Sequence, residues 1–193
     1  AGGGRIRNVA RRVVETRNQG SGVVVVVAAM AGVADQLVAY ANEISPAPDP
    51  REYDMLVSTG EQQTIALMAM AIQGLGVPAR SFTSAQVKVQ TDDDHARARI
   101  LRIDTERIRE ELARGGVPVL PGFQGVTDEG EITTLGRGAS DTTAVALAAA
   151  LRADVCEIFT DVTGVFTSDP RIVPNARKLP RVSYDEILEM ASL

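Results

Sequence analysis

The chain contains the run Val23-Val24-Val25-Val26-Val27-Ala28, and this stretch decides the fold. The run is apolar throughout and rich in β-branched residues, which is typical of a strand buried on both faces of a parallel sheet. It is too short to span a bilayer, which requires about 20 residues. We therefore predict a central strand of a parallel sheet at this position.

Helical and strand-like segments alternate on either side of this run. Helical spacing and composition predict helices over residues 5–19, 35–44, 60–74, 105–114, 140–152 and 183–193. Short apolar runs predict further strands over residues 79–83, 87–91, 117–121 and 155–160. The proline-rich residues 45–50 are expected to form a loop. This alternation predicts an α/β fold, specifically a three-layer α/β/α sandwich around a mainly parallel sheet.

The composition sets limits on size, partners and compartment. A length of 193 residues suits one domain, and 45% apolar residues can bury a sizeable core. The net charge is −5, and no basic block is interleaved with aromatics, which argues against nucleic-acid binding. The arginine clusters at 5–12 and 97–109 are expected to be solvated faces. With no signal peptide and no membrane span, we expect a cytoplasmic protein.

Cysteine and histidine are scarce enough to exclude some kinds of site. Cys156 is the single cysteine, so an internal disulfide and a cysteine-rich metal site are excluded. It lies in an apolar run, and we expect it to be a small buried hydrophobic residue. His95 is the single histidine, and nothing in the sequence points to a Ser-His or Cys-His catalytic pair around it.

Candidate chemistry is expected beyond the carboxyl ends of parallel strands, where loops run into helix starts. The first such segment is Thr133-Thr134-Leu135-Gly136-Arg137-Gly138-Ala139-Ser140-Asp141-Thr142-Thr143. Its glycines and the following helix start suit an anion, and Arg137 could grip a carboxylate or phosphate. The alternative is an ordinary helix start capped by Ser140 or Asp141, and spacing alone leaves both open.

Two further segments have the same placement. In Ser58-Thr59-Gly60-Glu61, Glu61 could bind a substrate ammonium, or could simply be a favourable charge at a helix start. The stretch from Thr160 to Arg171 combines aspartates, Phe166 and an arginine, as a nucleotide lid would. It could equally be a hairpin whose turn begins at Asp169-Pro170.

Taken together, these segments resemble the aspartokinases of the amino acid kinase superfamily. The likeness covers nearly the whole chain and is most specific in the order of its motifs. These motifs are Val26–Gly32, Gly122-Phe123-Gln124-Gly125, Thr133–Thr143, Thr160–Arg171 and Glu186–Ala191.

The resemblance implies transfer of the ATP γ-phosphoryl group to the β-carboxylate of L-aspartate, with Mg²⁺ and a lysine neutralising charge and no protein nucleophile. It implies that Glu61 holds the substrate ammonium and Arg137 its α-carboxylate, beside Ser140, while Asp141 orients the catalytic lysine. Phe123 and Thr134 would line the aspartate pocket. The residues implied around ATP are Thr160, Asp161, Phe166, Asp169 and Arg171. A homo-oligomer of the full-length parent is compatible with the family.

Several positions depart from the family pattern. The Lys-x-Gly-Gly strand that supplies the lysine is missing before Arg5, and the ACT domains expected after Leu193 are missing too. We therefore expect residues 1–193 to be a kinase domain truncated at both ends. Alanines replace family residues at Ala28, Ala34 and Ala139. These departures predict impaired catalysis by this chain as it stands.

Two other functions remain as alternatives. A different kinase of the superfamily, acting on glutamate or uridylate, is disfavoured by the pairing of Glu61 with Arg137. A non-catalytic module that binds nucleotide or a partner chain is favoured by the missing lysine, Ala28 and Ala34.

Overall fold

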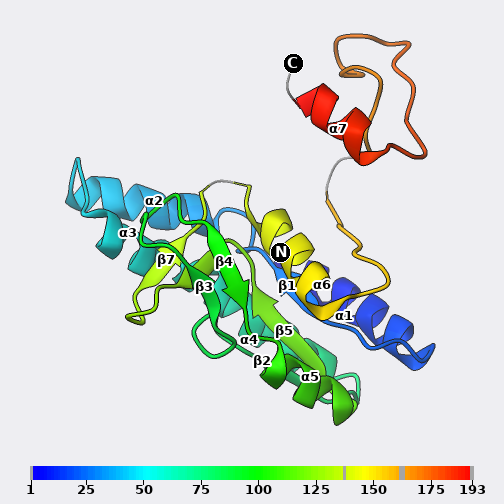
Figure 1. The fold of residues 1–193 in the computed structure, drawn as a ribbon, viewed down its shortest axis with the longest axis horizontal. Coiled ribbons are helices and arrows are strands. Elements are labelled where there is room, and N and C mark those ends of the chain that lie inside the picture. Colours follow the sequence, from blue (N-terminus) through cyan, green and yellow to red (C-terminus); the bar gives the residue numbers. More distant parts are fainter. Residues whose placement is uncertain (1, 137, 161–163, 192–193) are drawn as a thin grey trace. The chain divides into compact units, whose positions relative to one another are not determined.

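The computed structural model describes residues 2–136, 138–160 and 164–191, and Figure 1 shows its ribbon. The chain divides into two compact units, one ending at Cys156 and one beginning at Glu157. The helices are α1 (Gly2–Asn18), α2 (Val33–Ile44), α3 (Pro50–Val57), α4 (Thr59–Gln73), α5 (Glu106–Ala113), α6 (Ser140–Leu151) and α7 (Tyr184–Ala191). The strands are β1 (Val25–Val27), β2 (Ala79–Ser81), β3 (Val89–Thr91), β4 (Ile100–Ile103), β5 (Val117–Pro121), β6 (Gln124–Val126) and β7 (Ile132–Thr134).

A parallel sheet forms the centre of the first unit. Its strand order is β1-β5-β2, and both pairings are parallel, with Val25 opposite Val119 and Ala79 opposite Val117. All five residues of β5 are buried, because helices cover this middle strand on both faces. The predicted strands at 23–28 and 117–121 are thereby confirmed.

The side chains of this sheet alternate between two hydrophobic clusters. One cluster joins Val25, Val27, Val117 and Val119 to apolar residues of α1 and α4. The other joins Leu120 to residues of α5, α6 and β3. The helices therefore lie on opposite faces of the sheet (Figure 1), which confirms the three-layer α/β/α architecture.

A second sheet has the strand order β4-β3-β6-β7. It combines parallel and antiparallel pairs, which the sequence did not predict. The β3–β6 pairing is parallel, but β3–β4 and β6–β7 are antiparallel. The methyl group of Thr91 packs closely against the backbone of β6 at Gly125, where an added Cβ would overlap Cγ2 of Thr91. Only glycine therefore fits at this position of β6.

Helix α3 was not predicted, and it begins at Pro50, the last residue of the predicted loop. Asp49 caps it by accepting hydrogen bonds from the N–H groups of Arg51 (3.0 Å) and Glu52 (3.3 Å). Pro50 occupies the first helical turn, where its missing N–H costs nothing. The residues that looked like a simple break therefore start the helix that leads to Ser58 and Glu61.

The predicted strand at 155–160 is wrong. These residues are irregular and exposed, and they do not join the β1-β5-β2 sheet, whose edges are β1 and β2. An apolar run becomes a strand only where a neighbouring strand pairs with it. Cys156 is accordingly exposed, which corrects the expectation that it is buried.

The second unit contains a hairpin and helix α7. Phe166 and Lys178 form an antiparallel bridge, and the Thr167 N–H donates to the carbonyl of Arg177 (2.9 Å). Ser183 caps α7, because its Oγ accepts the N–H of Glu186 (3.3 Å) while the Glu186 carboxylate accepts the N–H of Ser183 (2.7 Å). Across the described part of the chain, no helix has the length and apolarity that crossing a bilayer requires.

Candidate active site at the carboxyl edge of the parallel sheet

The carboxyl ends of β1 and β5 meet at one edge of the sheet. Val27 lies opposite Pro121, and the N–H of Gly122 donates to the carbonyl of Val27 (2.9 Å). The chain then leaves β1 through Ala28 and Ala29 and leaves β5 through Gly122 and Phe123. This is the edge at which parallel α/β sheets bind ligands.

Glu61 lies beside this edge, at the start of α4. Its Oε1 accepts the N–H of Ala29 (3.1 Å), and its Oε2 accepts Nε2 of Gln124 (3.3 Å). The residue is only 4% exposed. Burial raises the pKa of the Glu61 carboxyl, and the hydrogen bonds from its own backbone, Ala29 and Gln124 offset only part of that rise.

Close packing at Gly60 brings Glu61 to β1. A Cβ on Gly60 would lie 2.9 Å from Cβ of Ala29, so a larger residue would push the start of α4 away. Gln124 completes the arrangement by donating from Nε2 to the carbonyl of Ser58 (3.0 Å) as well. Glu61 is thus a carboxylate fixed by two segments that are distant in sequence, and it is suited to a cationic group.

The start of α6 packs against the end of β5. A Cβ on Gly122 would lie 2.7 Å from Cβ of Ser140, so this contact also requires glycine. Phe123 has a φ of 67°, and its N–H donates to Oγ1 of Thr143 (3.1 Å). Ser140 is half-buried and Asp141 is exposed in the first turn of α6. The free N–H groups of this helix start are available to an anion at the same edge.

Thr134 ends β7 next to the same loops. Its hydroxyl donates to Oδ1 of Asp54 (2.6 Å), its N–H donates to Oδ2 of Asp54 (3.1 Å), and the residue is 1% exposed. Oδ2 of Asp54 also lies within hydrogen-bonding distance of Nδ1 of His95 (2.8 Å). The N–H of Leu135 donates to the carbonyl of Phe123 (2.8 Å), which ties β7 to the β5 exit.

The first unit therefore brings together most of the predicted amino-acid site. Glu61, Ser140 and Asp141 lie at helix starts and Phe123 follows β5, while Thr134 ends β7. Arg137 and Asp161 lie outside the described residues.

Three residues of this site had no predicted role. Gln124 lay in a quoted motif, whereas Asp54 and His95 carried no local signal, since the contacts of Asp54 are with residues 41 and 80 positions away.

The predicted nucleotide residues Thr160, Phe166, Asp169 and Arg171 belong to the second unit. The Arg171 guanidinium donates to both carboxylate oxygens of Asp169 (3.1 and 2.7 Å), and this contact lowers the pKa of Asp169 and raises that of Arg171. The Arg171 N–H also donates to Asp169 (2.9 Å), which closes a turn. The geometry is that of the hairpin alternative, and ATP contact stays a prediction.

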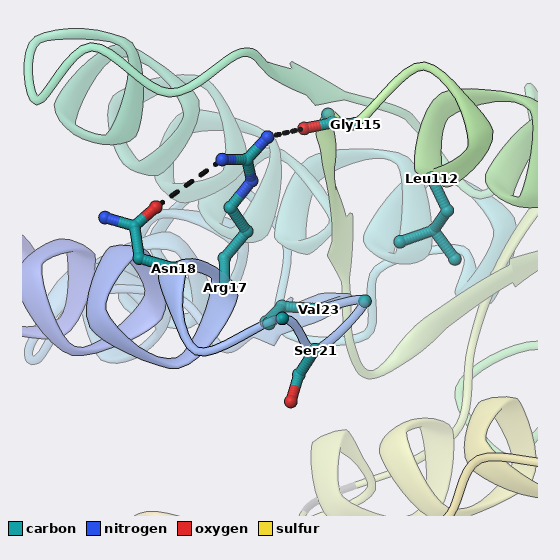
Figure 2. A pocket seen from close by; sticks show the side chains of 9 residues that line it. Arg17, Asn18, Ser21, Val23, Leu112 and Gly115 are labelled. Atoms are coloured by element: carbon teal, nitrogen blue, oxygen red, sulfur yellow. Dashed lines mark hydrogen bonds between the residues drawn. The ribbon is translucent and has the colours of Figure 1, made fainter.

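A separate depression of about 530 Å³ lies at the opposite edge of the sheet. Figure 2 shows its lining, in which Arg17 donates to the carbonyl of Gly115 (3.0 Å) and to which Leu112 and Val23 also contribute. Because it borders the residues before β1 and β5, it is at the amino ends of the strands, away from Glu61.

Comparison with known proteins identifies the family. The model of the amino acid kinase family matches residues 1–193. The chain belongs to the amino acid kinase family. Aspartokinases from Pseudomonas aeruginosa and Geobacillus stearothermophilus are each 57% identical to it over 189 residues, covering 98% of the chain and 46% of the relative. The chain thus spans about half the length of the curated relatives it matches, and the resemblance to aspartokinases is confirmed.

Solved structures of family members superpose on the chain. Aspartate kinase from Synechocystis has a TM-score of 0.82 at 49% identity, covering 98% of this chain and 31% of that one. E. coli aspartokinase III in complex with aspartate and ADP also has a TM-score of 0.82, at 27% identity, covering 96% of this chain and 53% of that one.

Proposed function

We propose that the protein containing this chain transfers the γ-phosphoryl group of ATP to the β-carboxylate of L-aspartate and yields 4-phospho-L-aspartate. This reaction is the entry step to the biosynthesis of lysine, threonine and methionine. Support comes from the aspartokinases at 57% identity and from the aspartokinase III structure that contains aspartate and ADP. A cytoplasmic location and a homo-oligomeric parent stay predictions.

The observation that carries the proposal is the buried carboxylate of Glu61. A carboxyl with a raised pKa at the ligand-binding edge of a parallel sheet is poised to pair with a cation. An amino-acid ammonium would stabilise the charged form of Glu61 and would be held at a fixed position, because Ala29 and Gln124 already orient both oxygens.

The opposite end of the amino acid would face the start of α6. We propose that Arg137 binds the α-carboxylate, as the resemblance implies, and that Ser140 and the N–H groups of α6 add favourable dipoles for negative charge. Phe123 would form the apolar side of the pocket. Asp141, in the first turn of α6, would orient the catalytic lysine of the parent protein.

ATP and Mg²⁺ would supply the phosphoryl group and neutralise its charge. We assign ATP contact to Thr160, Asp161, Phe166, Asp169 and Arg171. Among the described residues, no group of three or more His, Cys, Asp or Glu side chains could hold a metal ion. Mg²⁺ commonly binds through substrate phosphates and one or two carboxylates, so we propose that it enters with ATP.

A coupled assay on the full-length parent tests this function. We expect ATP-dependent formation of aspartyl phosphate, trapped with hydroxylamine, from L-aspartate but not from L-glutamate. Product from L-glutamate alone would show that L-glutamate is the substrate. Absence of product from both amino acids would favour the non-catalytic alternative.

That alternative has one specific observation in its favour. Lys88 and Lys178 are the two lysines of the sequence. Lys88 is exposed just before β3, and Lys178 lies opposite Phe166 in the hairpin of the second unit, so neither is part of the loops that directly follow β1 and β5 in the sequence. A nucleotide-binding module without turnover would need no lysine there, and nucleotide binding without product would identify it.

A further inference from the structure

Asp54 is the least exposed ionisable side chain among the described residues, at 0%. It accepts four hydrogen bonds, from groups on two other segments of the chain. These come from the Thr134 hydroxyl (2.6 Å), the Thr134 N–H (3.1 Å), the Ala96 N–H (3.0 Å) and Nδ1 of His95 (2.8 Å). A buried carboxylate is stable only when its oxygens are satisfied in this way.

The other contacts of Asp54 point to the direction of its contact with His95. Its oxygens already accept the Thr134 hydroxyl, the Thr134 N–H and the Ala96 N–H, and we infer that His95 donates likewise, with its hydrogen on Nδ1. Ala96 has a φ of 65°, in the left-handed region that alanine rarely adopts. The bond from its N–H to Asp54 stabilises that conformation and holds the turn after Asp94.

This cluster is joined to the candidate site through the loop that follows β7. Thr134 is followed by Leu135, whose N–H donates to Phe123, and by Gly136, which has a φ of 87°. A Cβ on Gly136 would lie 3.6 Å from the carbonyl of Ala96, so the turn held by Asp54 packs against the glycine-rich loop. Asp54 therefore fixes both the strand before this loop and the turn beside it.

Thr134 has no free donor with which to bind a substrate directly. Both its hydroxyl and its N–H donate to Asp54, and its carbonyl accepts the N–H of Ala98 (2.9 Å). Its two donors therefore act on a ligand only through Asp54 and the backbone that Thr134 anchors.

We propose that Asp54 is a positioning residue for the amino-acid site, with Thr134 and the Nδ1–H form of His95 as its partners. It sets the place of the loop after β7, which carries the α-carboxylate-binding side of the pocket. This role rests on the proposed binding of L-aspartate. It goes beyond the residues that the family resemblance assigns, none of which is Asp54 or His95.

The single histidine makes the local arrangement directly observable. In ¹H–¹⁵N spectra of the imidazole, we expect His95 of the unaltered chain to carry its proton on Nδ1 and Asp54→Asn to lose that preference. An unprotonated Nδ1 in the unaltered chain would overturn the proposed partnership, whatever the chain binds.

Calorimetric titration with L-aspartate tests the consequence for binding. We expect Asp54→Asn and Thr134→Val each to raise the dissociation constant by about 10- to 100-fold at unchanged stoichiometry, since small displacements of a positioning group cost this much. The double variant should lose little more than either single variant, because both remove the same contact.

The matched control is Thr91→Val. It removes a buried hydroxyl that lies 2.6 Å from the hydroxyl of Thr133. Thr133 precedes Thr134 on β7, but this contact does not involve Asp54. We expect it to lower stability and leave the dissociation constant unchanged.

The outcomes separate this proposal from the proposed function. Absence of L-aspartate binding to the unaltered full-length parent would refute the proposed function and, with it, this role of Asp54. Normal binding by the unaltered parent and by both single variants would refute the role of Asp54 alone. A fall in stoichiometry without a change in the dissociation constant would indicate a purely structural residue, and Thr134→Val keeps the test open if Asp54→Asn does not fold.

Discussion

Replacing Glu61 by glutamine should separate binding from stability at the candidate site. The substitution keeps the size of the side chain and removes its negative charge. Oε1 can still accept the N–H of Ala29, but an amide N–H₂ would then face Nε2 of Gln124, which is itself a donor. The variant therefore loses the ion pair with a substrate ammonium and one internal hydrogen bond.

The size of the binding effect follows from the geometry. A hydrogen bond to a charged group contributes about 1.5–3 kcal/mol, which corresponds to a roughly 10- to 100-fold weaker dissociation constant for L-aspartate. The upper part of that range applies here, because Glu61 is only 4% exposed and its carboxylate is held in place before the ligand arrives.

The stability effect has a defined sign. Burial raises the pKa of Glu61 above its ordinary value of 4.5, so the folded state binds more protons than the unfolded state between those values. The unaltered chain therefore loses free energy of unfolding as the pH rises from about 4.5 to the raised folded-state pKa, and the loss is complete above it. Glu61→Gln lacks this loss, so its stability relative to the unaltered chain should improve as the pH rises.

Urea unfolding from about pH 4 to about pH 8 measures the stability effect, and calorimetry measures binding. Glu111→Gln is the matched control, because Glu111 is a second buried glutamate (9% exposed) at the other edge of the sheet, beside Gly116. It should leave L-aspartate binding unchanged. Equal affinity of Glu61→Gln and the unaltered chain would refute the assignment of Glu61 to the substrate ammonium.

Further substitutions and ligands test other parts of the account. Gly122→Ala should lower the free energy of unfolding by about 1–3 kcal/mol, because its Cβ would lie 2.7 Å from Cβ of Ser140. The control Gly4→Ala, whose Cβ meets nothing within 4 Å, should not lower it when the two variants are compared by urea unfolding. Arg137→Lys keeps the charge but loses the planar fork, and should weaken L-aspartate binding by about 1–3 kcal/mol; unchanged saturation would remove Arg137 from the site. ATP should protect residues 160–171 from hydrogen exchange, and protection confined to other segments would refute the nucleotide assignment. Hydroxylamine trapping with this chain should give turnover far below about 1–100 s⁻¹, since neither of the two lysines, Lys88 and Lys178, is part of the loops that directly follow β1 and β5 in the sequence. Turnover in that range would mean that another cation acts there.

The central layers of the fold could be predicted from local pattern. Residues 23–28 and 117–121 are continuous apolar runs, and each became a parallel strand because helices cover both faces of the sheet. Residues 155–160 are also mainly apolar, although Glu157 interrupts them, but they form no strand, since pairing depends on a neighbouring strand that periodicity cannot reveal. Helix α3 was missed although Asp49 and Pro50 carry a helix-start signal, because eight residues give too little periodicity to detect.

The candidate site could be predicted only where its residues lie in glycine-rich motifs. Glu61 follows Gly60 at a helix start, and Phe123 follows Gly122, so local sequence marks both positions. Gln124, Asp54 and His95 act through contacts between segments far apart in the chain. Asp54 looks like an ordinary polar residue of a short helix until the fold places Thr134 and His95 around it.

The most direct test of the central claim is to titrate the ¹⁵N-labelled chain with L-aspartate and to map the amide shifts. The claim is that an amino acid binds at the carboxyl edge of β1 and β5, against Glu61. We expect saturable shifts that are largest at Ala29, Glu61 and Gln124, and that vanish in Glu61→Gln. Shifts confined to the depression around Arg17 and Gly115, or no saturable shifts at all, would contradict the claim.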